Sequence, residues 1–188
     1  MKISIMQPTF LPWVGYFYMI IQSDMFIFLD DVQFERRSFQ SRNKLLISNS
    51  QKTISVPVNS KNNYNQLLSE IEINYQRDWI NNHLKSIYFN YKKHKYFSEI
   101  YSLIEKNFRR KEIKIIDLNL KLIESICNYL EIDTKFNKSS FYKVKEKKSK
   151  KILGLIKKVG ATRYLTPERT KEYLGNDGKI LKDQNIEV

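Results

Sequence analysis

The sequence predicts an α/β fold with a mainly parallel sheet and a helical insertion, and three observations support this prediction. Lys2–Met6 and Met25–Leu29 are short apolar runs, which are typical of strands buried on both faces of a sheet. Trp13–Ser23 is apolar on all sides and predicts a buried helix between them, so this region has the length of a βαβ unit, about 30 residues. Helical periodicity then dominates residues 78–130.

The rest of the chain alternates between short strands and helices. Further strands are predicted at Thr53–Val58, Ile71–Ile73, Thr134–Phe136, Arg163–Leu165 and Ile186–Val188. Helices are predicted from Asp78, at Phe97–Phe108, at Lys111–Leu130, at Ser149–Val159 with Gly160 as the C-cap, and at Pro167–Leu174. There is no internal repeat. We therefore expect one domain over residues 1–188, with the helical insertion at about 78–130.

Hydropathy and cysteine content indicate a cytoplasmic protein. Lys2 is the only early charge, and Gln7 and two prolines interrupt the first apolar run, which disfavours a secretory signal peptide. The longest apolar run, Val14–Ile21, is far shorter than the ~20 residues that span a bilayer. The single Cys127 lies in an apolar helical pattern, where it is most simply a small core residue.

The chain is strongly basic, with a formal net charge of +13. Between Lys135 and Arg163 there are ten lysines and one arginine, against a single acid, Glu146. Such a block attracts phosphates in nucleic acid, nucleotide or acidic lipid, and the alternative is a solvated lysine-rich loop. Because an uncompensated lysine run is costly to bury, we expect Lys143–Lys151 to be mobile and exposed.

The densest polar segment, DDVQFERRSFQSRNK at residues 30–44, follows the end of the second predicted strand. Ligands of open parallel sheets bind beyond the carboxyl ends of the strands, so we expect a cleft between this segment and QPTFLPW at residues 7–13. Arginine, amide and aromatic side chains suit a phosphate, a sugar or base edge, and a ring to stack on. The alternative is a surface loop with ion pairs. The candidates for substrate binding are Gln7, Asp30, Gln33, Arg37, Gln40, Arg42 and Asn43, and Asp31 is a candidate catalytic base.

Histidine offers a second candidate for acid–base catalysis. On its predicted helix His83 shares a face with Trp79 and Ile87, which fits either a half-buried structural histidine or a general base. We predict no metal site, because Asp30 and Asp31 are adjacent and would point in opposite directions along a strand. The sequence has no Cys/His cluster, GxSxG, P-loop or GxGxxG motif, which disfavours serine or cysteine hydrolase, P-loop ATPase and Rossmann dehydrogenase functions.

Several unusual segments occur in a specific order: MQPTFLPWVGYF, FLDDVQFERRSFQSRN, a VPV strand, the Trp79-x-x-x-His83 helix, and VGATRYLTPERTKEYL. With these segments the sequence resembles the WbqC-like protein family over nearly its whole length. Members of that family continue for a few tens of residues beyond the last segment. They are encoded among genes for O-antigen of lipopolysaccharide and other surface polysaccharides, so the resemblance implies a step on an activated sugar. Tyr164, Thr166 and Tyr173 in the last segment are further candidates for substrate binding.

A second likeness concerns the fold. The W-V-G-Y stretch at Trp13–Tyr16, between a strand and a helix, resembles the H-x-G-H signature of the Rossmann-like, nucleotidylyltransferase-like fold. Gly15 matches, but Trp13 and Tyr16 replace both histidines, so adenylyl transfer by the usual route is not expected. Tyr16 is retained as a candidate for substrate binding. The stretch either brings amides to a ligand at a helix N-terminus or only packs the turn through Pro8, Pro12 and Trp13.

The family resemblance implies a transferase that places an acyl or aminoacyl (glycyl) group on the amine of a nucleotide-linked amino sugar. Asp31 or His83 would act as the base, and Arg37, Arg42 or Asn43 would stabilise the oxyanion. No cofactor is assigned. The alternatives are an RNA-binding protein, a hybrid in which aminoacyl-tRNA is the donor and partner, and a non-catalytic biosynthetic scaffold.

Overall fold

The computed structural model describes residues 1–60, 65–167 and 186–187. The chain forms two compact units. The first unit comprises Met1–Gln7, Trp13–Asp31 and Glu131–Val188, and the second comprises Pro8–Pro12 and Val32–Leu130. The helices expected at 78–130 belong to the second unit, which also contains strands. The expectation of one domain with a helical insertion stays a prediction.

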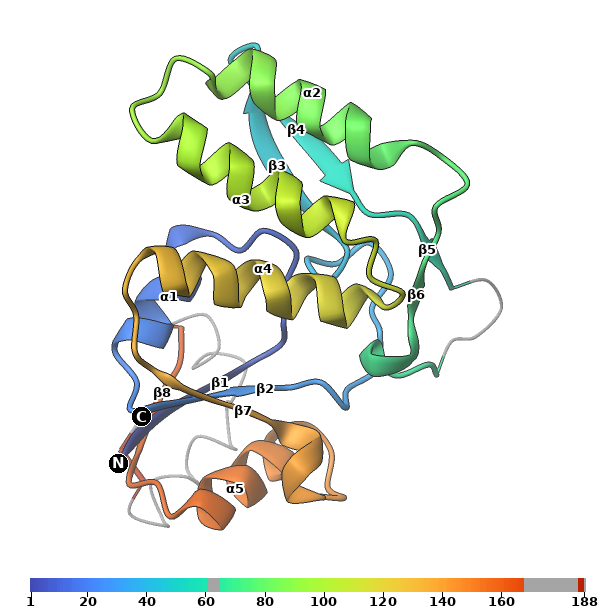
Figure 1. The fold of residues 1–188 in the computed structure, drawn as a ribbon. Coiled ribbons are helices and arrows are strands. Elements are labelled where there is room, and N and C mark those ends of the chain that lie inside the picture. The colour runs from blue at the N-terminus through green and yellow to red at the C-terminus, as the bar shows by residue number, and fades with distance from the viewer. Residues whose placement is uncertain (61–64, 168–185, 188) are drawn as a thin grey trace. The chain divides into compact units, whose positions relative to one another are not determined.

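The first unit is built on a parallel sheet with the strand order β7-β2-β1-β8. Its helices α1 and α5 lie on opposite faces of this sheet (Figure 1). This arrangement confirms the predicted Rossmann-like α/β fold with a mainly parallel sheet. The elements of the first unit are β1 (Lys2–Met6), α1 (Val14–Ile21), β2 (Met25–Phe28), β7 (Lys135–Lys138), the 3₁₀-helix η2 (Ser139–Tyr142), α5 (Lys148–Val159) and β8 (Arg163–Leu165).

Alternation along the buried strands supplies an apolar layer to each face of the sheet. On the α1 face, the ring of Phe26 lies 5.3 Å from the ring of Tyr16 on α1. On the other face, Ile3 and Ile27 pack in one cluster with Leu155 of α5. Because both of its faces are covered, the central strand β2 is apolar at every position.

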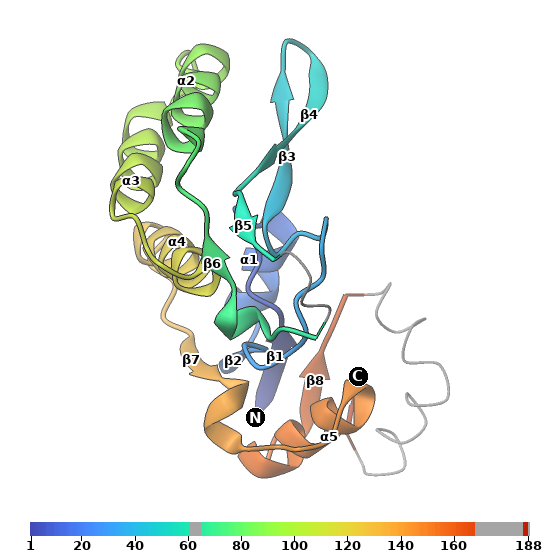
Figure 2. The same ribbon diagram turned by 90° about the vertical axis from the view of Figure 1, so that its right-hand side faces the viewer.

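The second unit combines antiparallel strands with three α-helices within its described residues. Figure 2 shows the β3–β4 hairpin on one side of α2, and the backbone N–H of Leu46 in β3 donates to Tyr91 Oη of α2 at 3.0 Å. The elements are β3 (Arg42–Ile47), β4 (Ser50–Ser55), β5 (Val58–Asn59), the 3₁₀-helix η1 (Leu68–Glu70), β6 (Glu72–Ile73), α2 (Trp79–Tyr91), α3 (Phe97–Arg109) and α4 (Ile115–Tyr129).

The structure differs from the sequence prediction at particular elements. The strand β3 was not expected, and the predicted strand at Thr53–Val58 is divided between β4 and β5. The helix predicted from Lys111 begins at Ile115, which leaves Ile113 outside it and exposed. The helix predicted at Pro167–Leu174 lies almost wholly outside the described residues. None of the helices in the described ranges has the length and apolar character needed to span a bilayer.

Candidate active site at the carboxyl edge of the parallel sheet

The carboxyl ends of the parallel strands in the first unit carry polar side chains. Gln7 follows β1, Asp30 and Asp31 follow β2, Ser139 follows β7, and Thr166 follows β8. Because the strands are parallel, these residues lie along one edge of the sheet, where α/β proteins bind their ligands.

Asp30 is a buried carboxylate that joins the end of β2 to the start of η2. Its Oδ1 accepts the backbone N–H of Ser140 at 2.9 Å, and its Oδ2 accepts the Ser140 hydroxyl at 2.6 Å. The Ser139 hydroxyl lies 3.0 Å from the same Oδ1, and the Asp30 backbone N–H donates to this hydroxyl. With only 5% of the residue exposed, Asp30 orders the edge of the site.

Asp31 is held from two sides but keeps an exposed surface. Its Oδ2 lies 2.7 Å from Nζ of Lys151 on α5, and its Oδ1 accepts a bond from the Ser139 hydroxyl. The Asp31 side chain remains 23% exposed, whereas that of Lys151 is only 9% exposed. The carboxylate is therefore oriented by a buried cation and still open to a ligand.

Lys151 corrects the expectation that Lys143–Lys151 would be exposed. Lys143, Lys145 and Lys147 are exposed, but Lys151 is buried. Its ammonium group pairs with Asp31 and also donates to the Val144 carbonyl at 3.2 Å, so its charge is compensated inside the fold. Neither Lys151 nor Ser139 was predicted from the sequence as a site residue. A usable signal was present, because Lys151 lies one helical turn before Leu155, on the buried side of α5.

The tyrosines predicted to bind substrate in this unit are core residues. Tyr16 is fully buried, and its hydroxyl donates to the Gln7 carbonyl at 3.1 Å. Tyr164 is 2% exposed and packs in the α5-side cluster, and burial raises the pKa of its hydroxyl, which also bonds Thr166. Tyr173 lies outside the described residues.

The remaining candidates of the segment 30–44 belong to the second unit. Gln40 is buried, and its amide oxygen accepts the Glu35 backbone N–H at 2.8 Å. Asn43 donates its amide to the carbonyls of Phe10 and Leu11. Gln33 and Arg37 are exposed, Arg37 has a positive φ of 60°, and Arg42 is half-buried at the start of β3.

Side-chain amides hold the segment Pro8–Pro12 through hydrogen bonds to its backbone carbonyls. Asn119 of α4 donates its amide N–H groups to the carbonyls of Pro8, at 3.2 Å, and Gln40, at 2.8 Å. Asn43 holds the carbonyls of Phe10 and Leu11, as described above. These contacts favour the interpretation that the segment packs a turn. Asn119 is fully buried, and it was not predicted from the sequence because its neighbours form an apolar helical pattern.

Gly15 has a packing role at the start of α1. A Cβ at this position would lie 2.4 Å from Nε1 of Trp13, so the indole ring needs a residue without a side chain here. Trp13 is the N-cap of α1 and makes no side-chain capping bond.

His83 in the second unit is half-buried beside Trp79, with ring centroids 5.6 Å apart. Its Nε2 lies 2.9 Å from the Ser55 carbonyl. Burial lowers the pKa of His83 below its usual 6.5, and the Ser55 bond opposes this effect. The environment favours a neutral imidazole with Nε2–H as donor.

The sequence profile of the WbqC-like protein family matches residues 7–188. The chain belongs to the WbqC-like protein family. It is also 30% identical over 188 residues to the uncharacterized protein Rv1507c of Mycobacterium tuberculosis, covering 100% of this chain and 80% of that protein. No solved structure matches the sequence. Membership of the WbqC-like family suggests a role in polysaccharide biosynthesis.

In this WbqC-like protein, the part of the chain that the structure describes contains no group of three or more His, Cys, Asp or Glu side chains able to hold a metal ion. Among the described residues at this edge of the sheet, Asp31 is an acid–base group that is open to a ligand. An oriented carboxylate can accept a hydrogen bond from a sugar hydroxyl, or a proton from an attacking amine.

Proposed function

We propose that this WbqC-like protein transfers an acyl or aminoacyl group, such as glycyl, to the amine of a nucleotide-linked amino sugar. The observation that carries the proposal is the Asp31 carboxylate, which is 23% exposed and is held by Lys151 and Ser139 at the carboxyl edge of the sheet. Family membership supports the polysaccharide context, and the position beyond β2 supports a ligand at this edge.

In the proposed reaction, the sugar amine attacks the carbonyl carbon of an activated donor, a thioester or an ester. A carbon–nitrogen bond forms, and the bond between the acyl carbon and the sulfur or oxygen of the donor breaks. Asp31 accepts the proton that the amine nitrogen loses and passes it to the leaving thiolate or alkoxide. Lys151 holds the carboxylate in place, and Gln7 at the end of the neighbouring strand β1 contacts the substrate.

The test is an assay of the purified protein with UDP- and dTDP-linked amino sugars and acyl or aminoacyl donors, followed by mass spectrometry. We expect an added acyl mass on the amino sugar. The matching nucleotide sugars that carry a hydroxyl in place of the amine are the control, and they should stay unmodified. Equal acylation of both substrates would reject the amine as acceptor.

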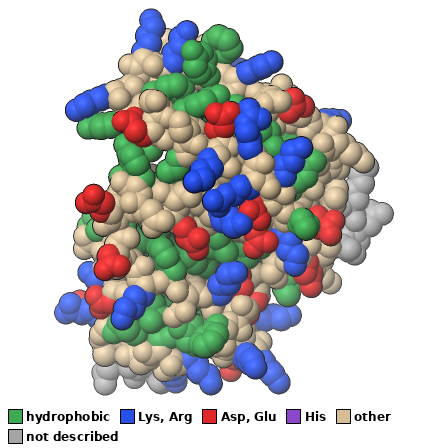
Figure 3. All heavy atoms as spheres, in the orientation of Figure 1, with side chains coloured by type: hydrophobic (Ala, Val, Ile, Leu, Met, Phe, Trp, Pro, Cys, Tyr) green, Lys and Arg blue, Asp and Glu red, His purple; other side chains and the backbone are tan. Residues whose placement is uncertain are grey.

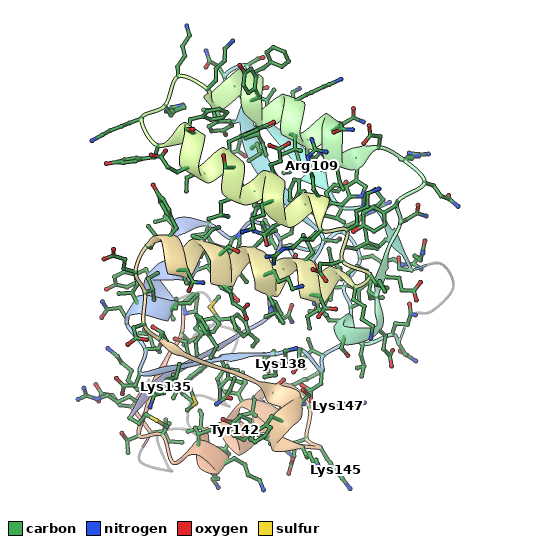
Figure 4. All side chains as sticks on the ribbon, in the orientation of Figure 1. Arg109, Lys135, Lys138, Tyr142, Lys145 and Lys147 are labelled. Atoms are coloured by element: carbon green, nitrogen blue, oxygen red, sulfur yellow. The ribbon has the colours of Figure 1, made fainter. Side chains whose placement is uncertain are left out.

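A basic segment in the first unit favours RNA binding as a second candidate function. Lys138, Lys145 and Lys147 are exposed, and Figure 4 shows them on β7 and on the segment that leads to α5. Phe141 between them is 74% exposed and offers a ring for stacking. If RNA is bound here, affinity should fall steeply with salt, whereas binding of a nucleotide sugar should be saturable and depend mildly on salt.

A further inference from the structure

The turn between α2 and α3 carries exposed aromatic rings. Tyr88 and Phe89 at the end of α2 are 44% and 68% exposed, and Tyr96 before α3 is 57% exposed. Lys92, Lys93 and Lys95 lie between them and are exposed. Figure 3 shows Lys and Arg side chains next to hydrophobic side chains where these helix ends meet. We call these three aromatic residues and three lysines the turn surface.

Positive charge dominates around the turn surface, and the acid nearest to it in the sequence is the exposed Glu99 in the first turn of α3. The sequence between Asp78 and Glu99 contains no acid, and it holds Lys85 in addition to the three lysines of the turn surface. The adjoining β3–β4 hairpin, which bonds to α2 through Ser48 and Asn90 at 3.1 Å, contains no acid either. This surface is therefore complementary to a dense negative charge.

A lysine ammonium group lies over each ring of the turn surface. Nζ of Lys92 lies 5.4 Å and 5.8 Å from the ring centroids of Tyr88 and Phe89, and Nζ of Lys95 lies 5.0 Å from that of Tyr96. These ammonium groups occupy ring faces on which nucleic-acid bases would stack. Apolar ring edges with lysines at their rim are the combination that proteins use at the headgroup boundary of a membrane.

We propose that the turn surface binds the surface of a membrane that contains anionic lipids. Phe89, the most exposed of the rings, inserts at the boundary between headgroups and acyl chains. The three lysines contact the anionic headgroups while their alkyl stems cover the rings. This binding is peripheral and independent of the proposed transfer reaction.

The test is sedimentation of the full chain with vesicles. One vesicle contains phosphatidylcholine alone, and the other contains equal parts of phosphatidylcholine and phosphatidylglycerol. We expect binding only to the anionic vesicle. The triple variant K92Q/K93Q/K95Q should bind it at least about tenfold more weakly, because each lysine near an anionic surface contributes measurably. Phe89→Ser should also weaken binding, by several-fold.

Matched variants elsewhere on the chain separate this surface from a general charge effect. K106Q/K111Q/K114Q removes the same charge from exposed positions elsewhere in the second unit and should bind nearly as well as the unchanged protein. Ile113→Ser, at a position 71% exposed in the second unit, is the control for Phe89→Ser. Melting curves of all variants should agree, since every replaced side chain is exposed.

Three results would overturn the proposal. The first is no sedimentation of the unchanged protein with anionic vesicles. The second is an equal loss in the two triple variants, which would indicate charge alone. The third is that the unchanged protein binds a single-stranded RNA oligonucleotide but no vesicle, and that K92Q/K93Q/K95Q loses the RNA binding. That result would assign the surface to RNA.

Discussion

Lys151 Nζ and Asp31 Oδ2 lie 2.7 Å apart, although 120 residues separate them in the sequence. Their ion pair connects the N-terminal turn of α5 to the segment that follows β2. The pair thus stabilises the contact between α5 and the segment after β2, and it also orients the partly exposed carboxylate of Asp31. Substitutions at these two positions can separate the two roles.

The first prediction concerns the stability that the ion pair between Lys151 and Asp31 provides. Lys151→Met should lower the free energy of unfolding by about 2 kcal/mol, because the partly buried Asp31 carboxylate would lose its cation. Lys150→Met, at the exposed neighbouring position, should change stability little. Urea denaturation of both variants measures the difference, and equal midpoints would show that the ion pair contributes nothing.

The second prediction concerns the buried amide that holds the opening segment in the second unit. Asn119→Leu should reduce the free energy of unfolding by about 2 kcal/mol, because the carbonyls of Pro8 and Gln40 would lose their donors. Asn128→Leu, at an exposed position of the same helix, is the matched control. Equal melting temperatures for the two variants would show that Asn119 does not anchor the opening segment.

The third prediction concerns the pH dependence that His83 adds to stability. Its folded pKa lies below 6.5, so the unfolded chain binds the proton first as the pH falls. The contribution of His83 to the free energy of unfolding should therefore be fully present above pH 6.5. Below that pH it should decline, by up to about 1.4 kcal/mol per pH unit, until the folded pKa is reached. His83→Gln keeps a donor for the Ser55 carbonyl and should lack this component.

The measurement is the melting temperature of both proteins between about pH 7 and pH 5, which brackets the usual histidine pKa. As the pH falls, the melting temperature of the unchanged protein should decrease more than that of His83→Gln. A difference that is constant with pH would mean that burial does not perturb His83.

The parallel sheet could be predicted because its determinants are local. Met25–Phe28 is apolar at every position, and such a run has few alternatives to a strand buried on both faces. The hairpin of β3 and β4 was not predicted, although its turn is also local. Its two-residue turn places Ser48 and Asn49 at φ of 50° and 59°. Asparagine is common in this turn geometry, but a serine at the first position does not indicate it.

The candidate site could be predicted only in part. Asp31 was selected because it follows a buried strand, and the structure does place it at the carboxyl edge of the sheet. Its partner Lys151 was hidden within a run of lysines, whose composition alone predicts exposure. Only the tertiary position of α5 makes one of these lysines a buried counter-ion.

The central claim is that Asp31 takes part in the reaction as well as in the ion pair. Its most direct test compares Asp31→Asn with Lys151→Met, since both break the pair but only Asp31→Asn removes the carboxylate. Turnover of the amino-sugar nucleotide is measured by mass spectrometry under conditions in which melting curves show both variants folded. We predict a loss of at least about 100-fold for Asp31→Asn, the range for a general base, and a much smaller loss for Lys151→Met. Equal turnover per folded molecule in the two variants would contradict the claim.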